Sequence, residues 1–271
     1  MTNIEGFPFI DLISILTEEE LEKLQELLMR IPLEVKCRKR KNLLHYFFRE
    51  AIEENEMQPI IIYGRRGGGK STLALKSTAY FFMDYYGLEC GEAYLEVFKR
   101  LVHTPKEFFL TKSKYSDIII WDDAGVWLST YFWYLPGMRS YLAWFFNWYD
   151  TSRTDVKVLV FTTPHPKKLP PVVRSDIEVL RVRIRRIGAD VKSNRKYKIA
   201  LAHIVKHDVS DYSMKEFDED AGAMTYTVRL PDLVYEAYSI IRDGYHRLAN
   251  KMWEKVMVEK KLLHHALAEE E

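Results

Sequence analysis

The chain has 271 residues, of which 47% are hydrophobic and 29% charged, with only 12 glycines and 10 prolines. This composition excludes a largely disordered or collagen-like chain, and the length allows a large buried core without a disulfide framework. The 40 Lys and Arg nearly balance the 39 Asp and Glu, but residues 157–198 hold 12 basic and 3 acidic residues. So uneven a distribution indicates a surface that faces a polyanion.

The chain carries no sign of secretion or of a membrane. Its two cysteines, Cys37 and Cys90, are too few for a metal site, and its first residues lack the basic start and apolar core of a signal peptide. We therefore expect a reducing cytoplasm and no membrane partner. Gln occurs only twice beside abundant Lys and Glu, a pattern that points to a thermophilic source.

Residues 1–56 are predicted to form an N-terminal helical extension. Thr17 opens a capping box, and leucines then recur at helical spacing, which predicts a helix over 17–30 that ends at Pro32. A second amphipathic helix is predicted over 43–54.

Residues 57–187 are predicted to form an α/β core with a mainly parallel sheet between helices. Short apolar runs without alternation indicate strands that are buried on both faces. These runs are residues 60–63, 118–121 and 158–161. Three helices are predicted in this core. The first covers residues 70–83, the second begins after Thr104, and the third covers about 141–151. No clear strand is predicted between the first of these helices and the run at 118–121, where residues 97–102 are only a weak candidate.

Residues 188–271 are predicted to form a β-hairpin and a long helix. A strand that begins near residue 180 pairs back with 196–205, and an acidic loop at 216–220 leads to a short strand at 224–230. A long helical segment follows over 231–267.

Residues 64–71 match the pattern G-x-x-x-x-G-K-[ST] between a buried strand and a helix start, where phosphate binding requires it. Glycines let the backbone curl so that N–H groups and the helix dipole hold phosphate oxygens. Lys70 then reaches the β- and γ-phosphates of ATP, and Ser71 offers a hydroxyl to Mg²⁺. The predicted nucleotide-binding residues are Gly64, Arg65, Arg66, Gly67, Gly68, Gly69, Lys70, Ser71 and Thr72.

Polar side chains end the other two buried runs, at the sheet edge where ligands bind. Asp122 is predicted to hold Mg²⁺ with Ser71, and Asp123 to orient and deprotonate the attacking water. The two aspartates could instead cap the following turn. Thr162 and Thr163 either hold the attacking water or sense the γ-phosphate, or they only pack at the end of their strand.

Two groups of arginines are candidates for anion contact. Arg174 could be an arginine finger offered to a neighbouring subunit. In the strand near residue 180, alternate arginines face one side about 7 Å apart, close to the phosphate spacing of one nucleic-acid strand. The alternative is that they serve acidic neighbours such as 216–220. The predicted DNA-binding residues are Arg181, Arg183, Arg185, Arg186, Lys192 and Arg195.

The motifs IIIYGRRGGGKST, IIIWDDAG, VLVFTT and LPPVVRSD, within residues 59–187, resemble those of AAA+ P-loop ATPases. They are most similar to the branch of replication initiators and helicase loaders, including small ATPases of archaeal viruses and plasmids. The resemblance implies Lys70 and Ser71 as the Walker A pair, and Asp122 and Asp123 as the Walker B pair. It further implies Thr162 or Thr163 as a sensor, and Arg174 as the finger of a homo-oligomer.

Three functions stay open from the sequence. The first is a Mg-dependent ATPase that acts on DNA in replication initiation, helicase loading or remodelling, with a possible partner protein. The second is a small-molecule or nucleotide kinase, and the third is an ATP-gated binding module with slow turnover. The aromatic residues between 131 and 149 favour core packing, with base stacking or subunit packing as alternatives.

Overall fold

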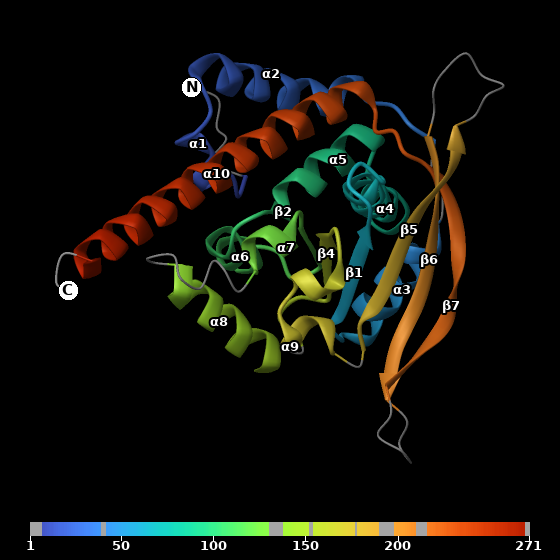
Figure 1. The fold of residues 1–271 in the computed structure, drawn as a ribbon. Coiled ribbons are helices and arrows are strands. Elements are labelled where there is room, and N and C mark those ends of the chain that lie inside the picture. The colour runs from blue at the N-terminus through green and yellow to red at the C-terminus, as the bar shows by residue number, and fades with distance from the viewer. Residues whose placement is uncertain are drawn as a thin grey trace.

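A seven-stranded sheet forms the centre of the computed structural model, in the order β2-β3-β4-β1-β5-β6-β7 (Figure 1). The structure describes residues 7–38, 42–129, 138–151, 154–176, 178–189, 198–209 and 216–268. Every pairing from β2 across to β5 is parallel, whereas β5, β6 and β7 pair antiparallel. The strands are β1 (Gln58–Gly64), β2 (Leu101–Val102), β3 (Ile118–Trp121), β4 (Val158–Thr163), β5 (Leu180–Ala189), β6 (Lys198–Val209) and β7 (Glu216–Thr227).

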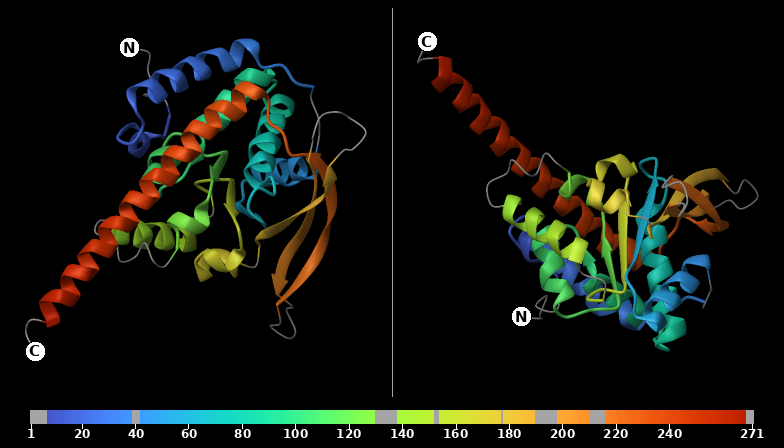
Figure 2. Two further views of the ribbon diagram at one scale, coloured as in Figure 1. Left: turned by 45° about the horizontal axis from the view of Figure 1, so that its top comes forward. Right: turned by 90° about the horizontal axis from the view of Figure 1, so that it is seen from below.

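Helices cover both faces of this sheet, with α3 and α4 on one side and α6 and α8 on the other (Figure 2, right). All residues of β3 and β4 are buried, as the absence of alternation predicts. The described helices are α1 (Ile10–Ile13), α2 (Glu18–Glu34), α3 (Leu43–Glu54), α4 (Lys70–Tyr85), α5 (Cys90–Lys99), α6 (Pro105–Lys112), α7 (Ala124–Trp127), α8 (Met138–Thr151), the 3-10 helix η3 (Pro166–Lys168), α9 (Pro171–Arg174) and α10 (Asp232–Ala268). The mainly parallel α/β architecture is consistent with a P-loop NTPase fold.

The N-terminal helices follow the predicted pattern with one difference. Thr17 and Glu20 cap α2 reciprocally, and α3 has the predicted bounds. The prediction that Pro32 ends the first helix is wrong, because α2 continues to Glu34. Leu28 and Ile31 are buried in the last two turns of α2, and their packing outweighs the one backbone hydrogen bond that proline removes.

A disulfide joins Cys37, just beyond α2, to Cys90 at the start of α5. A chain of this length does not need such a bond to fold, and nothing in the sequence predicted this pairing. Disulfides occur in oxidising compartments and also inside hyperthermophilic cells.

The short strand β2 lies at the sheet edge beside β3, so the expectation of no clear strand before the run at 118–121 is wrong. Its two residues are too few to produce a periodic pattern, and residues 97–99 belong to α5. The order of strands also places β4 between β1 and β3. The ends of these three strands therefore meet at one edge of the sheet.

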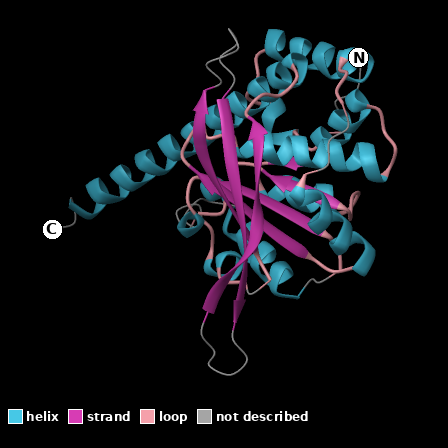
Figure 3. Ribbon diagram, turned by 90° about the vertical axis from the view of Figure 1, so that its right-hand side faces the viewer, coloured by secondary structure: helices cyan, strands magenta, loops and turns pink. Residues whose placement is uncertain are grey.

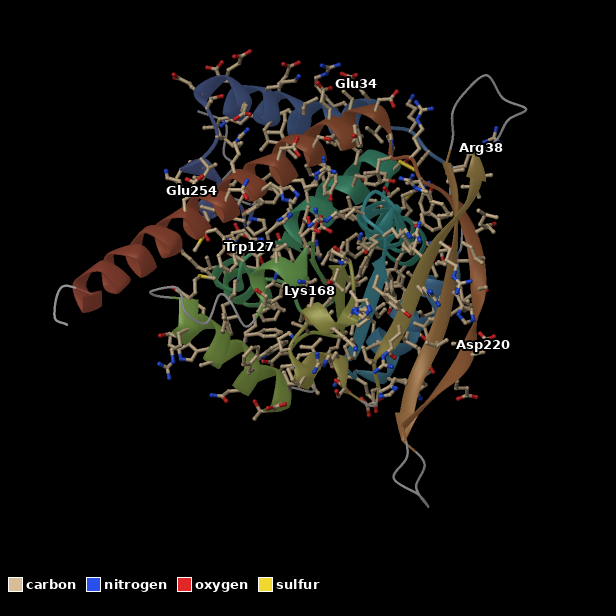
Figure 4. All side chains as sticks on the ribbon, viewed as in Figure 1. Glu34, Arg38, Trp127, Lys168, Asp220 and Glu254 are labelled. Carbon is tan, nitrogen blue, oxygen red and sulfur yellow. A yellow bond between two sulfur atoms is a disulfide. The ribbon has the colours of Figure 1, made fainter. Side chains whose placement is uncertain are left out.

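Strands β5, β6 and β7 extend the same sheet as long antiparallel strands (Figure 3). The predicted boundary at residue 187 falls inside β5, and the predicted acidic loop at 216–220 is wrong because β7 begins at Glu216. An edge strand tolerates charged residues where a central strand does not. Asp220 lies on this outer strand (Figure 4), where it pairs with His203 of β6 at 3.3 Å.

The C-terminal helix α10 runs alongside α2 and projects beyond the body of the molecule (Figure 1). No described helix is both long enough and apolar enough to cross a membrane. In α8, Phe145 and Tyr149 are buried in the core, whereas Trp144 is 60% exposed. Core packing thus accounts for part of the aromatic segment, whose residues 131–134 lie outside the described residues.

Candidate functional site

The loop between β1 and α4 has the backbone that its glycines predict. Gly67 and Gly69 have φ values of +66° and +96°, in the left-handed region that favours glycine. Lys70 is the first residue of α4, and its Nζ donates to the Arg65 carbonyl at 3.3 Å. Burial lowers the pKa of Lys70, although the charges of Asp123 and Asp122 oppose this effect. The lysine thus lies under the loop as a buried cation beside two carboxylates.

Asp122 is the centre of a buried hydrogen-bond cluster at the ends of β3 and β4. Its Oδ1 accepts from Ser71 Oγ at 2.7 Å and from Thr162 Oγ1 at 2.5 Å, and its Oδ2 accepts from Tyr238 OH at 2.6 Å. Burial alone would raise the pKa of Asp122, but the charge interaction with His103 and the three hydroxyl donors hold this pKa below its usual range. Asp122 is therefore a buried, ionised carboxylate in contact with the motif serine.

Asp123 differs from its neighbour in geometry and in charge. Its φ is +48°, and its N–H donates to Thr162 Oγ1 at 3.0 Å. This strained backbone directs the carboxylate into the adjacent pocket rather than into the core. Burial and the Asp122 carboxylate raise the pKa of Asp123 to about 7. A carboxylate with this pKa is suited to accept a proton near neutral pH.

The two predicted threonines have different roles because neighbouring strand residues face opposite sides. Thr162 belongs to the aspartate cluster, whereas Thr163 Oγ1 donates to the His165 carbonyl at 3.1 Å. Gly125 packs on Thr163 so closely that a Cβ there would collide with its hydroxyl and lie 2.8 Å from Lys168 Cβ. Thr163 therefore helps to position the segment that carries Asp123. Lys168 lies on η3 near the middle of the molecule (Figure 4).

Helix α10 supplies three site residues that the sequence analysis missed. Tyr238 donates to Asp122, His246 Nε2 lies 3.6 Å from Asp123 Oδ2, and Arg242 lines the same pocket. Their spacing of four residues places them on one helix face. That spacing was a usable signal, but nothing in the sequence indicates that this face lies against the P-loop.

A buried polar network connects α10 to the region below Asp122. His103 stacks on Tyr245 with ring centroids 3.9 Å apart, and the Tyr245 hydroxyl donates to Glu107. Glu107 also accepts from the backbone N–H of His103 and Thr104. Burial lowers the pKa of His103 to about 4 and raises the pKa of Glu107 to about 8. Both side chains are therefore mainly neutral at pH 7.

A cavity of about 950 Å³, here called the P-loop pocket, lies between the loop, Asp123 and α10. Its size is in the range of small-ligand pockets. Ser71 and Asp122 offer Mg²⁺ the oxygen ligands that it prefers, and phosphates and water complete such sites. The described residues include no cluster of three or more His, Cys, Asp or Glu that could hold a metal ion. The pocket is lined by loop and motif residues Arg66, Gly67, Gly69, Lys70, Ser71, Thr72 and Asp123, and by α10 residues Tyr235, Tyr238, Arg242 and His246, among others.

A second cavity, of about 1270 Å³, here called the arginine pocket, lies between the P-loop, the segment after β4, and β5. In β5, Val182 and Ile184 are buried while Arg183 and Arg185 are exposed, as the alternation predicts. Among the described residues that line this pocket, none is acidic. Its basic residues are Arg65, Arg66, Lys167, Arg174, Arg181, Arg183, Arg185 and Arg186.

The structure brings most of the predicted DNA-binding residues together in the arginine pocket. Lys192 and Arg195 lie outside the described residues. Arg174, at the end of α9, lines this pocket and bonds the Lys167 carbonyl at 3.4 Å, while Arg181 donates to the Arg174 carbonyl at 2.8 Å. Within this chain, Arg174 thus lies in the arginine pocket beside the loop residues Arg65 and Arg66.

Comparisons with known proteins leave the family open. No protein-family model matches the chain. An uncharacterized protein, B-251, of Sulfolobus spindle-shape virus 1 is 29% identical over an alignment of 204 residues, and the match covers 72% of this chain and 77% of that protein. Among solved structures, the FIGL-1 AAA domain is similar with a TM-score of 0.34 and 12% identity. That match covers 58% of this chain and 60% of that domain chain.

Proposed function

We propose that the chain is a Mg-dependent ATPase that acts on or with DNA. The observation that carries the proposal is the grouping of Lys70, Ser71, Asp122, Asp123 and Thr162 at one edge of the sheet, beside a pocket of suitable size. The start of α4, the turn after β3 and the end of β4, which are far apart in the sequence, supply these side chains.

The residues of the chain divide the reaction between them. The loop N–H groups and Lys70 would bind and orient the phosphates, and Ser71 and Asp122 would hold Mg²⁺, which when bound would supply positive charge to the phosphates. Asp123 accepts a proton from the attacking water, and Thr162 fixes the Asp123 backbone so that its carboxylate stays in the pocket. Arg242 of α10 adds a further cation to the lining of the pocket.

The arginine pocket supports the proposed action on DNA. Among the described residues that line it, several are basic and none is acidic. Such a surface binds phosphate backbones without regard to sequence. A role in replication initiation, helicase loading or DNA remodelling in a virus or mobile element fits the motif resemblance and the viral relative. In a homo-oligomer, Arg174 would act on a neighbour's nucleotide.

The test is the rate of phosphate release from ATP at elevated temperature, with and without Mg²⁺ and with single- or double-stranded DNA. The proposal expects Mg-dependent release that DNA changes. Phosphate that appears on a small acceptor instead of in water would identify a kinase. Tight nucleotide binding with negligible release would identify a binding module.

A further inference from the structure

Two arginines line the P-loop pocket and the arginine pocket at the same time. These are Arg66, in the loop itself, and Arg186, near the end of β5. The Arg186 guanidinium donates to the Gly67 carbonyl, and a Cβ built on Gly67 would lie 3.0 Å from one guanidinium nitrogen. Strand β5 reaches the loop because it pairs in parallel with β1, with Ile184 opposite Gly64. The two pockets thus share a cationic wall.

The arginine pocket is shaped for a linear polyanion rather than for one small anion. Arg181, Arg183 and Arg185 follow one another at two-residue spacing along β5, about 7 Å apart. A single phosphate can engage one or two of them, whereas a chain of phosphodiesters can engage the whole row. The cavity of about 1270 Å³ also exceeds the roughly 300–1,000 Å³ of ordinary small-ligand pockets.

We propose that the arginine pocket holds the phosphodiesters of one nucleic-acid strand, and that this strand competes with the P-loop nucleotide for Arg66 and Arg186. The two ligands then bind antagonistically. The inference rests on the proposed function for the identity of the ligand in the P-loop pocket.

The sign of the coupling follows from the chemistry of a guanidinium group. Its bonds to a phosphate are charge-assisted and stronger than a bond to a neutral carbonyl such as that of Gly67. When a strand recruits Arg66 and Arg186, the nucleotide loses two cations and gains a neighbouring anion. By linkage, the nucleotide weakens strand binding by the same factor.

The experiment measures the Kd of a non-hydrolysable ATP analogue with Mg²⁺, by calorimetry, with and without a saturating single-stranded oligonucleotide. Two double variants are compared, R66Q/R186Q and R183Q/R185Q. Each removes two cations from the arginine pocket, but only the first pair also lines the P-loop pocket. Each Kd ratio is taken within one variant, so a change in nucleotide affinity itself does not affect it.

In the wild type we expect the oligonucleotide to raise the Kd of the analogue at least about fivefold, the lower end of common coupling factors. The ratio of the Kd with oligonucleotide to the Kd without it should be unchanged in R183Q/R185Q at saturating oligonucleotide. In R66Q/R186Q this ratio should fall to between one and two. A wild-type ratio of one or below, or a full effect in R66Q/R186Q, would overturn the inference. An equal effect of a poly-glutamate peptide of the same charge would assign the pocket to an acidic protein instead. Loss of the proposed ATPase function is scored separately, as absence of phosphate release, because the Kd ratio requires no hydrolysis.

Discussion

Tyr238→Phe tests whether α10 is a structural part of the Asp122 site. Tyr238 is 4% exposed, and its hydroxyl is one of three donors to the buried Asp122 carboxylate. Phe fills the same space, so the change removes a hydrogen bond to a charged group without leaving a large cavity. Such a bond contributes about 1.5–3 kcal/mol to the free energy of unfolding. For a chain of this size, the melting temperature should fall by a few to about 10 °C.

The assay is urea unfolding at several pH values, with Tyr235→Phe as the matched control. Tyr235 lies one turn earlier on α10 and is 54% exposed. Loss of its hydroxyl should therefore change the free energy of unfolding little. Because the pKa of Asp122 is lowered in the folded state, its contribution is present above the unfolded pKa of about 3.9 and is lost at lower pH. The deficit of Tyr238→Phe should therefore shrink as the pH falls below about 4. A deficit equal to that of Tyr235→Phe at pH 7 would refute the contact.

Three further expectations concern other parts of the molecule. Arg174→Ala should lose ATPase activity alone but regain part of it when mixed with Lys70→Ala, because a finger acts on the nucleotide of a neighbour. The triple variant R181Q/R183Q/R185Q should lower the slope of log K against log[salt] for duplex DNA by about 2–3, as measured by fluorescence anisotropy. The free energy of unfolding of the wild type should fall as the pH rises from about 4 toward 8, as measured by urea unfolding. Glu107→Gln should abolish this fall. The raised pKa of Glu107, about 8, means that the folded state keeps a proton that the unfolded state releases.

Each of these expectations has its own control and contrary outcome. No recovery on mixing, with a monomer by light scattering, would remove Arg174 from any role between subunits. K23Q/R30Q/R49Q removes three cations outside the arginine pocket, and an equal fall in slope would mean that the β5 arginines have no special role. Parallel stability curves for Glu107→Gln and wild type would show that Glu107 is ionised in the folded state.

The sequence predicted the central strands and the P-loop side of the site because these features are local. Residues 64–71 curl where glycines permit it, and Asp122 and Asp123 follow a strand whose burial is evident from four consecutive apolar residues. The contribution of α10 could not be predicted in this way. Tyr238 and Asp122 are 116 positions apart, and only tertiary packing brings them together. The sequence did not predict the strand that begins at Glu216, because a stretch of acidic residues is typical of a loop. An edge strand, however, accommodates charged residues.

The most direct test of the central claim compares ATP binding and hydrolysis by the wild type, Lys70→Ala and Asp123→Asn. Lys70 is a buried cation at the loop, whereas Asp123 faces the pocket without bonding the loop. We expect Lys70→Ala to lose hydrolysis together with most nucleotide affinity. Asp123→Asn should keep affinity within a few-fold of wild type but lose turnover by at least about a hundredfold, the usual effect of removing a general base. Normal turnover in Asp123→Asn, or unchanged ATP affinity and hydrolysis in Lys70→Ala, would contradict the assignment of this pocket as an ATPase site.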